Sequence, residues 1–448
     1  MIWLLILLGC APSGSNPAPP NLVLISIDTT RSDHVGTDAK ADTPQLNAIA
    51  AKGTRFTRAT TVSNNTLPAH ISMLSGQMPQ KTGVPRNGFK LSSSTQWLPT
   101  ILQSAGWQTA AFVSASALSG NLGLSRGFDE FDDATTIKEI DQRQRRGEST
   151  VSVATNWIEQ PHEKPYFLWV HLFDPHYPYT PPSPFNEGND DYSGPADGSM
   201  EYLMGVWGRG RPKVATTAAD RAQLNRLYAG EVSYLDTQIG RLTKALLRKD
   251  PNTLIVISAD HGESLTEHDY LYDHGQYLYQ PTVQIPLIVR PPETWPVTEK
   301  ESEALAQTTD VFPTLLSAAQ LSVPTDTDGR NLLPAMTDTI SLRDVAFAES
   351  CRPWQIEKRH KADYQNLWKA TMALRWPHKL IVTPYQDATE LYDLNSDPQE
   401  TKNIAESHPD VVDSLASAIE DWRGNAISIG RPDLENMEQI KALGYIEE

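Results

Sequence analysis

Three almost wholly apolar runs constrain the fold of this chain most strongly. They are Asn21–Asp28 (NLVLISID), Tyr166–Phe173 (YFLWVHLF) and Thr253–Ala259 (TLIVISA). Continuous runs of β-branched and aromatic residues are typical of strands that are buried on both faces, as in a parallel sheet. The sequence therefore predicts a sheet whose central strands are covered by helices on either side.

Segments with helical patterning alternate with these strands. Helices are predicted at Pro44–Lys52, Leu98–Ala105, Thr150–Glu159 and Thr217–Arg248, and further strands at Thr109–Ser114 and Pro286–Val289. In the longest helix, apolar residues such as Leu224, Leu227 and Leu235 recur at helical spacing. This alternation predicts an α/β fold with a mostly parallel sheet flanked by helices, and we assign it to residues 21–330.

Two segments and the C-terminal part depart from this rhythm. The charged segment Asp141–Glu148 is predicted to be a solvated loop or a helix start, and Tyr177–Val214 a long polar lid or binding loop. After Asn331 the composition changes, with a hairpin expected at Trp368–Arg375 and His378–Thr383 and a helix at Pro409–Arg423. Residues 331–448 are therefore predicted to form a small C-terminal α+β subdomain.

The charge balance of the chain bounds its partners. With 38 Lys and Arg against 55 Asp and Glu, the formal net charge is −17, which argues against binding to a nucleic-acid backbone. It leaves room for a small anionic substrate at a local metal site. Two cysteines are too few for a disulfide scaffold.

The N-terminal sequence predicts that the protein is located at the cell envelope. Met1–Gly9 is apolar but too short to span a bilayer, and Leu7-Leu8-Gly9-Cys10 resembles a bacterial lipobox. That resemblance implies cleavage before Cys10 and a lipid on its sulfur, with Ala11–Pro20 as a tether. Residues 1–20 would then hold the protein on the periplasmic side through a lipid anchor only. The alternative is an ordinary signal peptide that is cut elsewhere.

Polar side chains follow the predicted strands where parallel sheets place their sites. Asp28 ends the first strand, Asp174 and His176 follow the second, and Asp260 with His261 ends the third. His274 lies in the loop beyond. Together, carboxylates and imidazoles at strand ends predict a divalent metal site. Taken singly, each could instead be a helix cap, a turn residue or a structural hydrogen-bonding group.

A candidate nucleophile lies in the segment Asn65-Thr66-Leu67-Pro68-Ala69-His70. A proline in the first helical turn would place Thr66 at a helix N-terminus, which favours anions. A hydroxyl is a weak nucleophile at neutral pH, and metal coordination would lower its pKa. The alternative is that Thr66 only caps the helix.

These segments together resemble the sulfatase family within the alkaline phosphatase superfamily. The similar stretches are Ile25–Gly36, Thr66–His70, Asp174–Tyr179, Ser258–Glu263 and Glu390–Leu394, the last followed by Asp397-Pro398 and Asn403. They occur in the order found in the family, between about Asn21 and Asn403. The resemblance implies an alkaline phosphatase-like fold and a metal-dependent reaction at an ester.

The resemblance also implies roles for the matching residues. It implies metal ligands at Asp28, Asp260 and His261 with Thr66 as fourth ligand and nucleophile, catalytic histidines at His176 and His274, and substrate contacts at His70, Asn87 and Lys90. One divalent ion is expected, either Mn²⁺, Ca²⁺, Zn²⁺ or Mg²⁺, with a second as a possibility. Asp174 would either orient His176 or belong to that second site.

The chain departs from the family pattern at the nucleophile. Sulfatases carry Cys or Ser in a C/S-x-P-x-R context and convert it to formylglycine, whereas Thr66 and His70 take those places here. Thr29 replaces the second Asp of a frequent Asp pair, and His261 stands where Asn is common. This pattern resembles the single-manganese phosphotransferase branch and one half of the two-zinc phosphodiesterase site.

We therefore predict a hydrolase or phosphotransferase acting on sulfate or phosphate esters, with a small-molecule, glycan or lipid ester as substrate. The alternative is a non-catalytic, metal- or ligand-binding envelope protein on the same fold.

Overall fold

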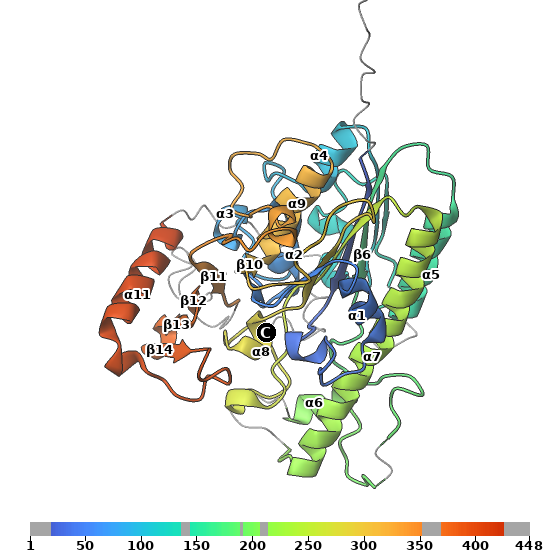
Figure 1. Cartoon of the computed structure of the whole chain (residues 1–448). Helices are drawn as coiled ribbons and strands as arrows, with labels where there is room; N and C mark the ends of the chain where they lie inside the picture. The colour runs from blue at the N-terminus through green and yellow to red at the C-terminus, as the bar shows by residue number, and fades with distance from the viewer. Residues whose placement is uncertain (1–18, 136–143, 189–190, 207–213, 352–368, 425–448) are drawn as a thin grey trace, which may run out of the picture.

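The computed structural model describes residues 19–135, 144–188, 191–206, 214–351 and 369–424 (Figure 1). Cys10, with the lipid anchor predicted there, lies outside the described residues, as do Asp141, Trp368 and the end of the predicted C-terminal subdomain. Within the described ranges, no helix combines the length and the apolar character needed to cross a membrane.

An eight-stranded sheet forms the centre of the molecule, with the order β5-β4-β6-β1-β7-β8-β2-β9. Its strands are β1 (Asn21–Ile27), β2 (Thr54–Phe56), β4 (Gln108–Phe112), β5 (Glu130–Asp132), β6 (Tyr166–Leu172), β7 (Thr253–Ala259), β8 (Leu287–Arg290) and β9 (Glu301–Ser302). Only β8 runs antiparallel to its neighbours β7 and β2, so the sheet is mostly parallel as predicted. A separate two-stranded ladder joins β3 (Ala59–Thr60) to β10 (Ala306–Gln307).

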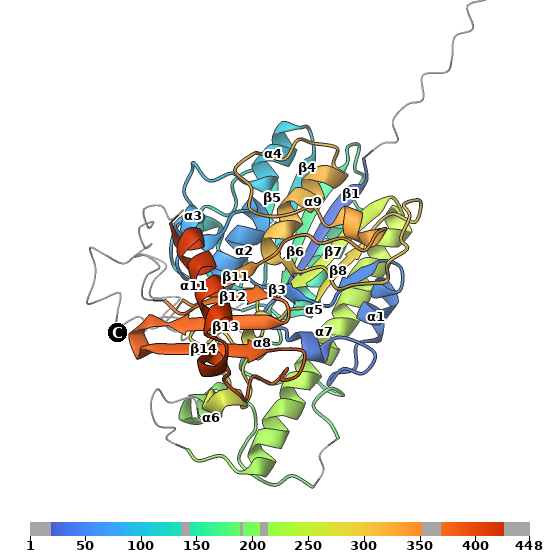
Figure 2. The ribbon, with the colours of Figure 1, turned by 60° about the vertical axis from the view of Figure 1, so that its left-hand side comes forward.

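Helices cover both faces of this sheet (Figures 1 and 2). They are α1 (Pro44–Ala50), α2 (Thr66–Ser75), α3 (Pro79–Thr82), α4 (Leu98–Ser104), α5 (Gly147–Glu159), α6 (Met200–Val206), α7 (Ala218–Lys249), α8 (Gln280–Val283) and α9 (Val311–Ala318). Alternate residues of β1 point to opposite faces: Val23 and Ile25 pack in one core with α1, α5 and α7, and Leu22 and Leu24 in another with α2, α4 and α9. These two cores explain why Leu22–Ile25 of β1 are apolar on both faces of the strand.

The register of the three central strands aligns their carboxyl ends. Ile27 of β1 pairs with Leu172 of β6 and with Ala259 of β7. Because all three strands are parallel, the residues that follow them emerge at one edge of the sheet. Asp28 and Asp260, which lie 232 positions apart in the sequence, are thereby brought together, as the strand pattern predicted.

Two sequence-based expectations for irregular segments need correction. The Tyr177–Val214 segment is not wholly loop, because it contains α6, and its residues Tyr179 and Leu203 are buried against Leu224 and Tyr228 of α7. The sequence predicted a polar loop here because these apolar residues are widely spaced among polar ones. In the described end of the charged 141–148 segment, α5 begins at Gly147, which confirms the predicted helix start. Glu148 is exposed there, but Arg145 is buried and bonded to Thr150 and Asp132, so the segment is only partly solvated.

A four-stranded antiparallel sheet with one helix on it forms the C-terminal subdomain (Figure 2). Its elements are β11 (Ala346–Glu349), β12 (Thr371–Arg375), β13 (His378–Thr383), β14 (Ala388–Asp393) and α11 (Pro409–Arg423). Leu415 and Ile419 of α11 pack on Leu380 and Leu391 of the sheet. This confirms the small α+β subdomain expected from the sequence.

Candidate active site

A compact cluster of side chains able to ligate a metal lies at the carboxyl edge of the central sheet. Asp28, Asp260 and His261 each offer a ligand atom, and these atoms lie within 4.8 Å of one another. All three side chains are fully buried. The backbone reaches this geometry directly, since Asp260 N–H donates to Ile27 O at 3.1 Å and continues the β1–β7 ladder by one residue.

The chemistry of this cluster fits a divalent cation. Both oxygens of Asp28, Oδ2 of Asp260 and Nε2 of His261 are buried and lack a normal hydrogen bond from the part of the chain that the structure describes. Burial raises the pKa of the Asp28 carboxyl, and the charge of Glu263 raises it further. Burial and the charge of Asp28 likewise raise the pKa of Asp260. Such a carboxylate pair is costly unless a positive charge compensates it.

The His261 imidazole is fixed in the form that can ligate a metal. Its Nδ1 lies 2.9 Å from the Gly262 carbonyl oxygen, which can only accept, so Nδ1 carries the proton. Nε2 therefore presents a lone pair, 3.5 Å from Asp260 Oδ2. Burial and the neighbouring His274 hold the pKa of His261 well below its usual range, which keeps the ring neutral.

Thr29 holds the Asp260 carboxylate through its backbone. It has a φ of 45°, which a β-branched residue rarely adopts, and it donates its N–H to Asp260 Oδ1 at 3.1 Å. Its carbonyl oxygen accepts a hydrogen bond from the Tyr228 hydroxyl at 2.7 Å. Strain of this kind persists only where the surroundings impose it, and it is commonest at functional sites.

Thr66 is the first residue of α2 and lies beside the Asp28 carboxylate. It is fully buried, and its side chain lowers the pKa of Asp28 against the effect of burial. Asn87 holds this end of the helix: its Oδ1 accepts from Leu67 N–H at 2.7 Å, and its N–H donates to Asn65 Oδ1 at 2.8 Å. Asn87 Nδ2 makes no hydrogen bond to any described residue, so a donor remains for the oxyanion contact predicted there.

Two further histidines, His274 and His176, lie next to His261 of the cluster. The ring centroids of His261 and His274 lie 4.5 Å apart, and those of His274 and His176 lie 5.3 Å apart. Glu263 is buried behind them, with Oε1 3.1 Å from His274 Nδ1 and Oε2 accepting from the Tyr179 hydroxyl at 3.3 Å. Sequence reasoning quoted Glu263 in a motif but gave it no role.

The structure places other predicted site residues differently. His70 is buried with both ring nitrogens bonded to protein groups, Thr66 O and Ser26 Oγ, which argues against a substrate contact. Lys90 is exposed, unlike the buried cluster. Asp174 accepts from Gly147 N–H at 3.0 Å and so caps the start of α5.

A histidine that sequence reasoning missed faces the cluster from β6. His171 Nε2 lies 3.4 Å from Asp28 Oδ2, and both side chains are fully buried. Its position inside an apolar run is the usual one for a core residue. The signal that could have found it is its place one residue before the carboxyl end of a central strand.

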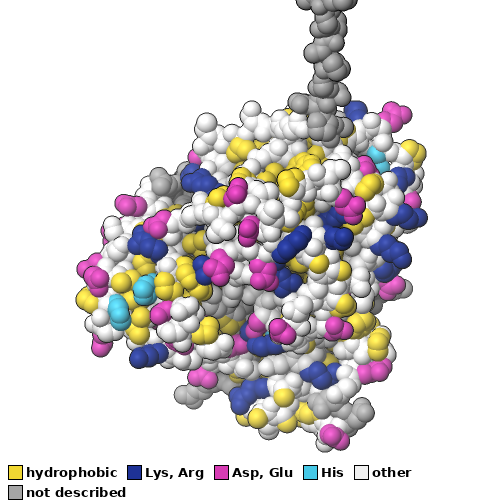
Figure 3. All heavy atoms as spheres, viewed as in Figure 1, with side chains coloured by type: hydrophobic (Ala, Val, Ile, Leu, Met, Phe, Trp, Pro, Cys, Tyr) yellow, Lys and Arg dark blue, Asp and Glu magenta, His cyan; other side chains and the backbone are white. Residues whose placement is uncertain are grey.

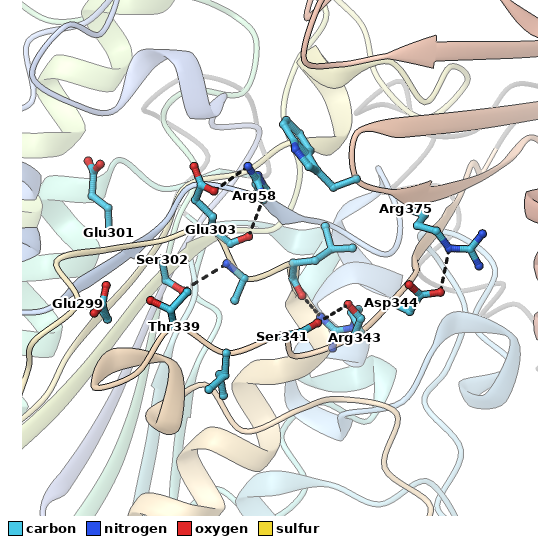
Figure 4. Close-up of a pocket in the computed structure, with 14 residues that line it drawn as sticks. Arg58, Glu299, Glu301, Ser302, Glu303, Thr339, Ser341, Arg343, Asp344 and Arg375 are labelled. Atoms are coloured by element: carbon cyan, nitrogen blue, oxygen red, sulfur yellow. Dashed lines mark hydrogen bonds and ion pairs between the residues drawn. The ribbon is translucent and has the colours of Figure 1, made fainter. Parts of the chain in front are cut away.

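A separate cavity of about 630 Å³ opens between the catalytic sheet and the C-terminal subdomain (Figure 4). It is lined by charged residues of both signs, and Arg58 pairs with Glu303 and lies over the ring of Trp376. None of the three metal-cluster residues lines it.

Elsewhere on the surface, acidic and basic side chains are interspersed over the face that Figure 3 shows.

Comparison with known proteins places this chain in a family. Residues 20–321 match the sulfatase family model, which covers more than half of the chain. The chain belongs to the sulfatase family. Residues 266–425 also match the C-terminal region of N-sulphoglucosamine sulphohydrolase. These matches confirm the prediction of a sulfatase-type ester hydrolase.

Relatives and solved structures extend over most of the chain. Arylsulfatase K of Mus musculus is 24% identical over 477 residues, covering 93% of this chain and 83% of its own length. The phosphonate monoester hydrolase of Agrobacterium radiobacter superposes with a TM-score of 0.73 at 20% identity, covering 91% of this chain and 96% of that one. BT4656, solved with its substrate D-glucosamine-2-N,6-O-disulfate, has a TM-score of 0.72 at 20% identity, with coverages of 91% and 98%. These likenesses confirm the predicted fold.

Proposed function

We propose that this protein is a metal-dependent hydrolase of phosphate, phosphonate or sulfate esters with Thr66 as its nucleophile. One observation supports this most: Thr66 is buried at the first turn of α2, beside Asp28. Family members with formylglycine carry Cys or Ser there. The N-terminal end of a helix favours the negative charge that a phosphoryl or sulfuryl group brings.

Asp28, Asp260 and His261, with the Thr66 hydroxyl, would hold the divalent cation. When bound, the cation would lower the pKa of the Thr66 hydroxyl, whose proton is lost to solvent, and polarise the ester. Asn87 Nδ2 and the N-terminal end of α2 would stabilise charge on the ester oxygens. His176, whose ring packs against that of His274, would help to orient the substrate.

The remaining steps use groups of this chain. Thr66 Oγ forms a bond to phosphorus or sulfur while the bond to the leaving alcohol oxygen breaks, and His274 donates a proton to that oxygen. Water then attacks the Thr66 ester and gives its proton to His274, which releases phosphate or sulfate and restores Thr66. Glu263, 3.1 Å from His274 Nδ1, orients the imidazole for both transfers.

Phosphorus esters are the preferred substrates in this proposal. Thr66 stands where sulfatases carry formylglycine, and the pattern around it resembles the phosphotransferase branch. Because Thr66 has a single hydroxyl, turnover ends only when water or an acceptor alcohol attacks the covalent intermediate. The neighbours named for a phosphonate monoester hydrolase and for a disulfated glucosamine complex share this fold. They make aryl phosphonates, aryl phosphates and sulfated sugars the first compounds to test.

The experiment compares turnover of matched aryl phosphate, phosphate diester, phosphonate and sulfate esters with Mn²⁺, Zn²⁺, Ca²⁺ or Mg²⁺. We expect activity on a phosphorus ester that is lost in Thr66→Ala and partly kept in Thr66→Ser. Mass spectrometry of quenched reactions should find the added group on Thr66. Turnover that survives in Thr66→Ala would overturn the proposal, and metal binding without turnover of any ester would favour a binding protein.

We also propose that the mature protein is held at the periplasmic side of a bacterial envelope by lipid on Cys10. The lipobox-like Leu7-Leu8-Gly9-Cys10 and the small, Pro-rich tether after it support this. Wild-type protein should partition into detergent and incorporate labelled fatty acid in cells. Cys10→Ala should do neither, and equal labelling of both would overturn the proposal.

A further inference from the structure

A line of hydrogen bonds runs from the central sheet to the backbone of the proposed nucleophile. Trp169 Nε1 on β6 lies 2.9 Å from Ser26 Oγ on β1. Ser26 Oγ lies 2.9 Å from His70 Nε2, and His70 Nδ1 lies 2.7 Å from the Thr66 carbonyl oxygen. Trp169, Ser26, His70 and Thr66 are all fully buried. The line therefore crosses the sheet–helix interface where no water competes for its bonds.

The chemistry of the end groups permits one direction of donation along this line. An indole N–H only donates, and a carbonyl oxygen only accepts. Trp169 must therefore donate to Ser26 Oγ, and His70 Nδ1–H must donate to Thr66 O. In the neutral imidazole, His70 Nε2 is then the acceptor of a hydrogen bond from the Ser26 hydroxyl, which fixes the tautomer. Every donor and acceptor in the line is matched, which favours one geometry.

This arrangement bears on the nucleophile rather than on the substrate. His70 lies one helical turn after Thr66, and its bond adds a second donor to the carbonyl at the start of α2. Ser26 lies on β1 two residues before Asp28, so the line ties the Thr66 turn to the strand that carries a proposed metal ligand. We propose that His70, held by Ser26 and Trp169, is a positioning residue that fixes the first turn of α2 and thereby Thr66.

The inference rests on the proposed role of Thr66 and goes beyond it. It replaces the substrate contact expected for His70 from the sequence. A misplacement of a reacting group by about 1 Å can lower a rate by about 10²-fold, so a lost positioning bond should reduce kcat. A substrate contact would instead raise KM. The split between kcat and KM therefore separates the two roles.

The test uses conservative variants with matched controls in the same core. Trp169→Phe and Ser26→Ala each remove one polar atom from the line. Trp97 and Ser72 are also fully buried, on the same face of the sheet, and Trp97 Nε1 and Ser72 Oγ have no hydrogen-bond partner among the described residues. Trp97→Phe is therefore the control for the lost volume of an indole, and Ser72→Ala the control for a lost hydroxyl. Neither variant breaks a hydrogen bond between described residues.

We expect kcat to fall about 10- to 10²-fold in Trp169→Phe and Ser26→Ala, with KM changed less than about threefold. The two controls should keep the wild-type kcat. His70→Asn retains a donor near the Nδ1 position and should be more active than His70→Leu. If His70→Leu does not fold, the Trp169→Phe and Ser26→Ala pair decides the question.

Two results would overturn the inference. One is a kcat in Trp169→Phe and Ser26→Ala equal to that of the controls. The other is a rise in KM at unchanged kcat in His70→Asn, which would restore the substrate contact. Thr66→Ala is assayed alongside to separate this inference from the proposed nucleophile. Turnover in Thr66→Ala would refute Thr66 as the nucleophile. If Thr66→Ala is inactive while Ser26→Ala is as active as the controls, only the role of the hydrogen-bond line is refuted.

Discussion

His171 presents an N–H to the Asp28 carboxylate from the neighbouring strand, with 3.4 Å between His171 Nε2 and Asp28 Oδ2. The tautomer follows from the other nitrogen, because Ser114 N–H donates to His171 Nδ1 at 3.4 Å. Burial lowers the pKa of His171 to about 3, so the ring is neutral at physiological pH. His171 therefore places a neutral ring beside Asp28 without a normal hydrogen bond to it, and adds no charge to the site.

From this relationship we predict that His171→Phe weakens metal binding. Groups that orient a metal ligand typically contribute about 10- to 100-fold in affinity, and we expect a loss in that range by isothermal titration calorimetry. The control is His162→Phe, since His162 bonds to Gln108 and Trp157 O away from the cluster. Equal metal affinity in His171→Phe and His162→Phe would contradict the prediction.

Asp28→Asn should stabilise the metal-free protein while it abolishes metal binding. Burial and Glu263 raise the pKa of Asp28, so the folded protein holds a proton that the unfolded chain releases near pH 4. The stability from this proton is fully present below that pH and is lost as pH rises through the folded pKa. The advantage of Asp28→Asn over wild type should therefore grow with pH.

Urea unfolding of chelator-treated wild type and Asp28→Asn between pH 5 and 8 measures this difference. Added Mn²⁺ or Zn²⁺ should stabilise the wild type and leave the variant unchanged. A stability difference that shrinks as pH rises would show that Asp28 is not held in the protonated form without metal.

The sequence predicted the parts of the fold that depend on local patterning. The bounds of Thr253–Ala259 and Pro409–Arg423 agree with β7 and α11, because continuous apolar runs and helical amphipathicity are local signals. Asp28, Asp260 and His261 could be grouped in advance, since strand ends of one parallel sheet meet at one edge.

What the sequence left out depends on contacts between distant segments. His171 looks like a core residue until the β1–β6 register sets it opposite Ser26, two residues before Asp28. His70 follows a family motif, yet its two bonds to Thr66 and Ser26 exist only once α2 packs on β1. Asp174 follows a strand end like the proposed metal ligands, but its carboxylate accepts a hydrogen bond from Gly147 N–H at the start of α5.

Gly262→Ala should weaken metal binding without removing a ligand. A Cβ on Gly262 would lie 2.0 Å from the Pro281 carbonyl oxygen, so the backbone next to His261 would have to move. We expect a loss of about 1–3 kcal/mol in unfolding free energy and a lower metal affinity. Gly424→Ala is the control, because its nearest neighbour atom would lie 3.5 Å away. Wild-type metal affinity in Gly262→Ala would contradict this prediction.

A buried ion pair within the C-terminal subdomain, whose lysine also bonds to the segment before Asn87, yields the last prediction. Lys369 Nζ lies 2.6 Å from Glu349 Oε1 and donates to Pro85 O at 3.0 Å, two residues before Asn87. Both side chains are 1% exposed. Lys369→Met strands the Glu349 charge in the interior, so unfolding free energy should fall by about 3–5 kcal/mol.

Adding Glu349→Leu to Lys369→Met should recover most of that loss, because an apolar pair of similar volume needs no compensating charge. Arg248→Ala breaks an exposed pair with Glu159 and should change stability by about 1 kcal/mol or less. A urea-unfolding double-mutant cycle measures all of these. If the double variant is as unstable as the sum of both single ones, the cost lies in lost packing rather than in the stranded charge.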